Sequence, residues 1–282
     1  MLKNILSVDV EEFFHAEYVK QSHSGQVNFR TPDNLQLILR LFKDYDVKAT
    51  FFVVGEIAEK FPWILSDITE GGHEVAFHSW SHLSLRTINN KFFKEEISKF
   101  KKLCPSCIGY RAPSFSLNNN TRWALKILLE NGFHYDSSVF PTFTPLYGMV
   151  QAPIWPYIPS AEDISKETHN ISGIREFPLA VYEFFGLKLP IAGGFWLRFW
   201  DINLLKKGIK KLNAKGIPAV LYVHTWELDP PVTRVQLSPI KNFVTYHNLS
   251  DTKNRLLSIM DLFPFTTFKS YLEENNISVV AS

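Results

Sequence analysis

The sequence predicts a parallel α/β fold, and three observations lead to this prediction. Short apolar runs alternate with amphipathic helical segments along the first two-thirds of the chain. The runs are too uniformly apolar to be half exposed, as in parallel strands that are covered on both faces. Polar residues directly follow several runs, and barrel enzymes assemble their sites at the carboxyl ends of strands. The pattern fits both an open doubly wound sheet and an α/β barrel, and the placement of the polar residues favours the barrel.

Six segments are predicted as strands because they are rich in β-branched and aromatic residues. In chain order they are 4–10, 48–54, 73–78, 107–112, 134–139 and 217–224.

Two of the intervening segments carry clear helix signals. "TPDNLQLILRLFKDY", from Thr31, has an N-cap residue, a proline at the first helical position and apolar residues at helical spacing. "NNNTRWALKILLENG" begins with Asn and Thr and ends at Gly132, a natural helix stop. Residues from about 141 to 200 break the pattern with Pro, Gly and aromatic residues, and we interpret them as an irregular insertion that forms one wall of a cleft. We expect residues 1–282 to form a single domain.

The composition restricts the class of protein. Of 282 residues, 45% are hydrophobic and 21% are charged, which is typical of a soluble globular protein with a large core. The net charge of +2 is spread without a basic run, so a nucleic-acid partner is not expected. Neither a signal peptide nor a transmembrane segment is evident, which predicts a cytoplasmic location. Cys104 and Cys107 have no second pair to complete a zinc site, so free thiols are expected.

A pair of histidines in "HEVAFHSWSH" raises the question of a metal site. On a helical turn, His78 and His82 would share one face and could hold one ion, although two surface or capping histidines would have the same spacing. A catalytic zinc site usually has three protein ligands. "SVDVEEFFH" offers Asp9 and Glu11, which alternate to the same side of the strand end while Glu12 points away. These carboxylates either face a cation or arginine, or cap the next helix.

Two further residues follow apolar strands. Arg111, in "GYRAPSFS", could hold a carboxylate in a bidentate contact, or form an ordinary surface salt bridge. His224, in "AVLYVHTWELDP", could transfer a proton near neutral pH, or lie in the core bonded to a carbonyl.

The motifs "SVDVEE", "HSWSH", "RAPSFS", "YDSS" and "YVHTWELDP", in this order, resemble the polysaccharide deacetylases of carbohydrate esterase family 4, which share homology with the nodulation-factor chitooligosaccharide deacetylase. "IREFPLA", "LPIAGGFWLR" and the closing "TYHNLSDTKNRLLSIMDLFPFTTF" are similar to the branch associated with exopolysaccharide and exosortase gene clusters. The resemblance covers nearly the whole chain. It implies a distorted (β/α) barrel, commonly of seven strands, and metal-assisted hydrolysis of an N-acetyl group on an amino sugar.

The resemblance also implies roles for individual residues. Glu11, His78 and His82 would be the metal ligands and Asp9 the general base. Most of the family has adjacent aspartates in the first motif, whereas this chain has Asp-Val-Glu-Glu, as in a subgroup with split acids. The ion would be divalent, with zinc preferred and cobalt, nickel or manganese as alternatives.

The remaining roles concern proton transfer and substrate binding. Arg111 would orient Asp9, and His224 would be the general acid, tuned by Asp136 or Glu176. The residues expected to contact substrate are Ser114, Tyr147 and Trp226. A backbone N–H near Ser114 would donate to the oxyanion.

The expected partner is an N-acetylated glycan, either free or lipid-linked. Peripheral membrane contact and homo-oligomer formation are left open. The alternatives are a deformylase, an allantoinase-like amide hydrolase on the same barrel, and a non-catalytic saccharide-binding protein. The presence of Asp9, Arg111 and His224 argues against the last of these, because binding alone does not require a base, its orienting arginine and an acid.

Overall fold

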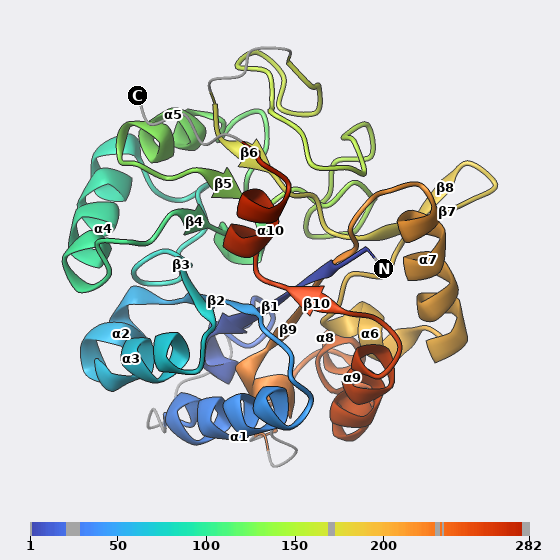
Figure 1. Ribbon diagram of the computed structural model, residues 1–282. Coiled ribbons are helices and arrows are strands. Elements are labelled where there is room, and N and C mark those ends of the chain that lie inside the picture. The colour runs from blue at the N-terminus through green and yellow to red at the C-terminus, as the bar shows by residue number, and fades with distance from the viewer. Residues whose placement is uncertain (1, 21–28, 169–172, 229–231, 233, 278–282) are drawn as a thin grey trace.

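The computed structural model describes residues 2–20, 29–168, 173–228, 232 and 234–277, and a curved parallel sheet lies at its centre (Figure 1). Its strands are β1 (Asn4–Val10), β2 (Thr50–Val53), β3 (Glu74–Phe77), β4 (Gly109–Tyr110), β5 (Tyr135–Asp136), β6 (Arg175–Glu176), β9 (Val220–His224) and β10 (Phe265–Thr266). Seven of them follow the order β9-β1-β2-β3-β4-β5-β6, with every neighbouring pair parallel. The predicted seven-stranded parallel barrel is therefore confirmed.

The centre of this sheet is β1, whose seven residues are all buried. One edge of β1 pairs with β9, in a register that sets Asp9 opposite His224. On its other edge, Ser7–Val10 pair with β2, and the first two residues pair with β10. This central place explains why the "NILSVDV" run is apolar almost throughout.

The barrel is closed between β6 and β9 by irregular backbone. The Leu179 N–H donates to the Val139 carbonyl at 2.9 Å, and the Ala180 N–H donates to Val220 at 3.1 Å. The Tyr222 N–H in turn donates to the Ala192 carbonyl at 2.8 Å. At Gly193, where φ is +149°, a Cβ would lie 1.7 Å from the Tyr222 carbonyl oxygen, so only glycine permits this approach.

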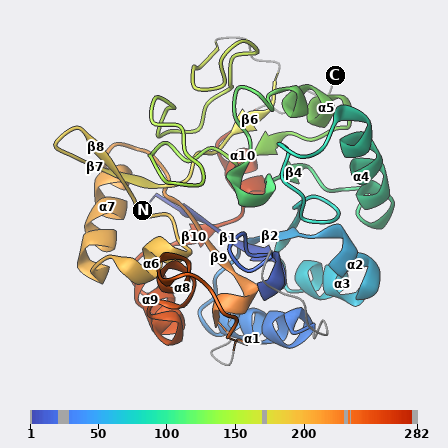
Figure 2. The ribbon, with the colours of Figure 1, turned by 180° about the vertical axis from the view of Figure 1, so that it is seen from behind.

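Helices surround the sheet on its outer side, except for α10 (Phe268–Glu274), which lies over the centre of the ring of strands (Figures 1 and 2). The others are α1 (Thr31–Asp44), α2 (Gly55–Lys60), α3 (Trp63–Glu70), α4 (Asn90–Leu103), α5 (Trp123–Glu130), α6 (Phe195–Phe199), α7 (Ile202–Ala214), α8 (Pro239–Tyr246) and α9 (Thr252–Met260). Both helices predicted from sequence, α1 and α5, are present, although the N-cap residue of α1 is Arg30 and not Thr31 as predicted. The start of α1 is capped by a residue from an earlier part of the chain. The Glu12 carboxylate accepts the Thr31 N–H at 2.7 Å and the Arg30 N–H at 3.1 Å.

All six predicted strands form, with β4 and β5 shortened to two residues. The segment predicted as an insertion contains β6, α6 and an antiparallel hairpin of β7 (Val181–Phe184) and β8 (Leu187–Pro190). These elements were not predicted, because strands of two to four residues show too few periods to detect. Cys104 and Cys107 are free thiols, as expected. Within the described residues, no helix has the length and apolar character needed to cross a membrane.

Candidate active site

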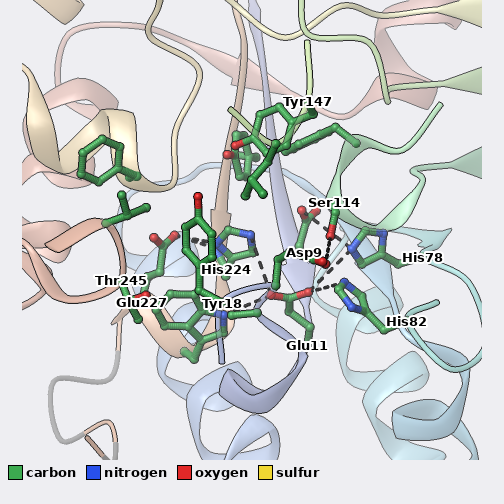
Figure 3. Close-up of a pocket in the computed structure, with 18 of the residues that line it drawn as sticks. Asp9, Glu11, Tyr18, His78, His82, Ser114, Tyr147, His224, Glu227 and Thr245 are labelled. Atoms are coloured by element: carbon green, nitrogen blue, oxygen red, sulfur yellow. Dashed lines mark hydrogen bonds and ion pairs between the residues drawn. The ribbon is translucent and has the colours of Figure 1, made fainter. Parts of the chain in front are cut away.

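Most of the residues singled out from the sequence line one cavity at the carboxyl ends of the strands, with a volume of about 120 Å³ (Figure 3). Eight of the ten predicted site residues are in its wall: Asp9, Glu11, His78, His82, Ser114, Tyr147, His224 and Trp226. Arg111 is buried behind Asp9, and Asp136 does not reach the cavity. The cavity is formed by residues that follow β1, β3 and β9, so the strand ends converge as the barrel prediction required.

Glu11, His78 and His82 form a buried cluster whose ligand atoms all lie within 4.8 Å of one another. Glu11 Oε2 is 2.6 Å from His82 Nε2 and 3.8 Å from His78 Nε2. Burial alone would raise the pKa of Glu11, but the imidazoles of His82, His224 and His78 hold it well below its usual range. A carboxylate and two imidazoles at this separation match the donor set of a catalytic divalent metal site with an open position.

The orientation of His78 supports this fit. Its Nδ1 lies 2.8 Å from the Arg111 carbonyl oxygen, which can only accept, so Nδ1 carries the proton. The lone pair of Nε2 therefore faces Glu11, the arrangement in which metal-ligating histidines are usually held. Burial lowers the pKa of His78 to about 4, so the ring is neutral at physiological pH.

The loop that presents these histidines is not the helical turn predicted from their spacing. Residues 78–82 are irregular, and Ser79 and His82 have positive φ angles of 58° and 51°. Glu96 of α4 holds this loop, since its Oε1 accepts the Ser81 N–H at 3.2 Å and the Ser81 hydroxyl at 2.9 Å. The His82 ring also stacks on His15, with centroids 5.1 Å apart. Long-range contacts, rather than helical periodicity, therefore bring the two imidazoles together.

Arg111 contacts Asp9 through a single nitrogen. Its Nη1 is 2.7 Å from Asp9 Oδ1, while its remaining donors go to Ser7 and to Ser137. The expected bidentate contact is therefore wrong, because these serines take up the rest of the guanidinium. Asp9 Oδ2 remains available and lies 4.0 Å from His78 Nε2.

The partner of His224 is Glu227, which corrects the prediction of Asp136 or Glu176. His224 Nδ1 lies 2.9 Å from Glu227 Oε2. Asp136 instead accepts from the Ser138 hydroxyl at 2.7 Å, and Glu176 accepts from the Val139 N–H at 2.9 Å. These two acids hold the loop after β5, which is why they cannot reach His224.

Glu227 is itself fixed by the buried Arg198 of α6, whose Nε and Nη2 lie 3.2 and 3.1 Å from Glu227 Oε1. Burial opposes ionisation of both members of the His224–Glu227 pair, but their mutual attraction prevails. The pKa of His224 rises to about 9, and that of Glu227 falls to about 2. The roles of Glu227 and Arg198 were not predicted from the sequence. An acid three residues after a candidate histidine was the one signal that could have found Glu227.

The three predicted substrate residues differ in how they face the cavity. The Ser114 hydroxyl donates to Glu17 at 2.9 Å. The Trp226 indole stacks on His224, with centroids 5.3 Å apart, and donates to Glu11 Oε1 at 3.1 Å. Tyr147 packs edge-on against Phe115, and burial raises its pKa to about 12. Trp226 therefore supports Glu11, while Ser114 and Tyr147 lie on the cavity wall (Figure 3).

Comparison with known proteins identifies two family models. Residues 25–131 match the model described as "Polysaccharide deacetylase", and residues 137–273 match a domain of unknown function, DUF3473. A peptidoglycan-N-acetylglucosamine deacetylase from Bacillus cereus is 38% identical over 94 residues, covering 31% of this chain and 34% of that protein. A peptidoglycan deacetylase from Helicobacter pylori is 34% identical over 116 residues, covering 39% of each. The alignments thus span little more than a third of the length of these relatives.

Solved structures confirm the fold. A Mycobacterium smegmatis protein assigned to the polysaccharide deacetylases has a TM-score of 0.57 at 18% identity, covering 98% of this chain and 91% of that one. The Bc1960 peptidoglycan N-acetylglucosamine deacetylase has a TM-score of 0.51 at 16% identity, with 95% and 87% covered. PuuE allantoinase has a TM-score of 0.55 at 16% identity, with 95% and 88% covered.

Proposed function

We propose that the protein is a hydrolase that removes an N-acetyl group from an amino sugar in a glycan, on the premise that residues 25–131 match the polysaccharide deacetylase model. One observation carries the proposal. Asp9, held by Arg111, and His224, held by Glu227, both line the cavity that contains the Glu11–His78–His82 cluster: Asp9 Oδ2 lies 4.0 Å from His78 Nε2, and His224 Nε2 lies 3.8 Å from Glu11 Oε1. A base, an acid and a metal-type donor set are together what metal-assisted hydrolysis of an amide uses.

In this proposal Glu11, His78 and His82 would hold a divalent ion, with zinc preferred for a carboxylate and two imidazoles. When bound, such an ion lowers the pKa of water towards neutrality and polarises the amide carbonyl. Asp9 would take the proton of the attacking water through Oδ2, because Arg111 already holds Oδ1. The part of the cavity wall near Ser114 would face the carbonyl oxygen of the substrate amide, which becomes negatively charged when water attacks.

His224 would protonate the leaving amine. Glu227 occupies its Nδ1, so Nε2 is the nitrogen left to face the cavity, where it lies 3.8 Å from Glu11 Oε1. A pKa of about 9 keeps His224 protonated at neutral pH, which suits a proton donor. Each positioned acid or base typically contributes about 10² to 10⁴ in rate.

We also propose that the glycan has an apolar portion, such as a lipid carrier. Phe195, in the cavity wall, contacts Phe199 and Phe243, with centroids 5.1 and 5.8 Å apart. Phe199 and Phe243 remain 39% and 45% exposed, so an apolar surface continues outward from the cavity. If a lipid-linked glycan and its free form are turned over with equal KM, this part of the proposal is wrong.

The deacetylation proposal is tested with purified protein, metal analysis and a mass-spectrometric screen of N-acetylated oligosaccharides and peptidoglycan fragments. The expected result is bound metal and release of acetate with loss of one acetyl group. Formate release would indicate a deformylase. Bound metal without release of acetate or formate would favour another amide substrate. If neither bound metal nor released product is found, a saccharide-binding protein is favoured.

A further inference from the structure

A hairpin projects from the side of the barrel, next to α7, and none of its residues is in the wall of the catalytic cavity (Figures 1 and 2). Phe184 of β7 pairs with Leu187 of β8, so Phe185 and Gly186 form a two-residue turn. The hairpin is anchored on α7, since Lys215, just after that helix, lies 2.6 Å from Glu183. This ion pair links β7 of the hairpin to the end of α7.

The tip is apolar and exposed. Phe184, Phe185 and Leu187 are 42%, 90% and 64% exposed. Phe185 and Gly186 have φ angles of 47° and 78°, the type I′ arrangement for which Asn-Gly is preferred. A bulky residue in this left-handed region is strained, and an exposed ring gains little from packing inside the fold. Strain kept at an exposed aromatic residue indicates a function outside the fold.

The surface beside the tip is strongly basic. The hairpin, α7, its N-cap and Lys215 contain two acids, Glu183 and Asp201, and six lysines, Lys188, Lys206, Lys207, Lys210, Lys211 and Lys215. Six positive charges minus two negative charges leave +4, more than the +2 of the whole chain. Lys207, Lys210 and Lys211 line one shallow groove together with Phe184 and Phe185. We call Phe184, Phe185, Leu187 and these three lysines the hairpin face.

We propose that the hairpin face docks the protein on a membrane that contains anionic phospholipids. The apolar tip would enter the boundary between headgroups and acyl chains, and the neighbouring lysines would lie at the level of the phosphates. A second copy of this chain fits less well, because a symmetric dimer would set the two lysine groups against each other. This inference is independent of the proposed catalytic activity.

Vesicle co-sedimentation of the whole protein tests the proposal. We expect it to bind vesicles of phosphatidylcholine mixed with phosphatidylglycerol, to bind vesicles of phosphatidylcholine alone much more weakly, and to be released by salt. Lys207→Glu/Lys210→Glu should lower partitioning at least about tenfold, as expected for reversing two charges near an anionic surface. Phe185→Ser should weaken binding even at low salt.

Matched controls are available on α4, on the other side of the barrel (Figure 1). Lys91→Glu/Lys102→Glu makes the same change in net charge on exposed residues, and Phe92→Ser removes an exposed ring. These variants should bind like the wild type. Equal binding to both kinds of vesicle, or equal losses in the hairpin and α4 variants, would overturn the proposal. So would a dimer in solution that Phe185→Ser converts to a monomer, because the occupant of the face would then be a second copy.

Discussion

Individual side chains of the cavity divide into a group that would hold metal and a group that would move protons. His78 belongs to the first, since its Nε2 faces Glu11. His224 and Asp9 belong to the second, and Arg111 and Glu227 hold them from outside the metal cluster. This division makes the two groups separable by mutation.

Substitution in each group should give a different result. We expect His78→Ala to lose bound metal and activity together. His224→Ala and Asp9→Asn should keep the metal and lower turnover at least about a hundredfold. Metal content by elemental analysis and acetate release on a confirmed substrate are the two measurements. Wild-type turnover by Asp9→Asn would show that another group is the base.

Glu227 should act through His224 without touching substrate. Glu227→Gln keeps the shape of the side chain but removes the charge that stabilises protonated His224. We expect kcat to fall about tenfold or more, with KM and metal content nearly unchanged, because proton donation is weakened while binding is not. Glu227→Asp should recover part of the loss. A rise in KM alone would instead indicate that Glu227 shapes the substrate site.

At the scale of elements, the loop after β3 depends on α4, the helix that follows it in the chain. Glu96 of α4 accepts two hydrogen bonds from Ser81, in the middle of the loop between His78 and His82. The loop contains two residues with positive φ, so it needs such support to keep its shape.

Removing this support should weaken the metal site. Glu96→Ala is expected to lower metal affinity about tenfold to a hundredfold, the usual effect of losing an outer hydrogen-bond partner. The control is Glu95→Ala, an exposed acid of the same helix that should leave affinity unchanged. Competition with a chelator measures both. Equal affinity in the two variants would mean that the loop keeps its shape without Glu96.

On the scale of the whole molecule, the cavity is shared between parts of the chain that match different family models. His78, His82 and Arg111 lie in the deacetylase region, while His224, Glu227 and Arg198 lie in the DUF3473 region. Asp9 and Glu11 precede both. The barrel joins them, because β1 pairs with β2 on one edge and with β9 on the other. We propose on this basis that residues 1–282 act as one domain.

Global stability should depend on pH through buried histidines such as His73. Its Nδ1 accepts the Ala49 N–H at 3.2 Å, and burial, aided by Lys48, lowers its pKa from 6.5 to about 4. The unfolded chain therefore binds more protons between these values, and stability is lost as pH falls through this window.

His73→Gln should flatten this dependence. We expect urea denaturation at pH 7 and pH 5 to show a smaller difference in unfolding free energy for the variant than for the wild type. His134→Gln should have a smaller effect, because burial also lowers the pKa of His134 but this side chain is only half-buried. An unchanged pH dependence in His73→Gln would assign the effect to other histidines.

The sequence by itself determined the strand-forming runs, their parallel orientation and the set of motifs at the strand ends. These are local properties, because apolar runs and helix signals depend only on residues that are close together in the sequence. Asp9, Glu11, His78, His82, Arg111 and His224 could all be singled out in this way.

Only the tertiary structure decided which of these side chains meet. The pairing of β1 with β9 sets Asp9 opposite His224, and the Glu96 contact folds the histidine loop without a helix. Glu227 and Arg198, 29 residues apart, come together only when the barrel closes between β6 and β9. Such contacts depend on register and closure over long sequence separations, and no local pattern encodes them.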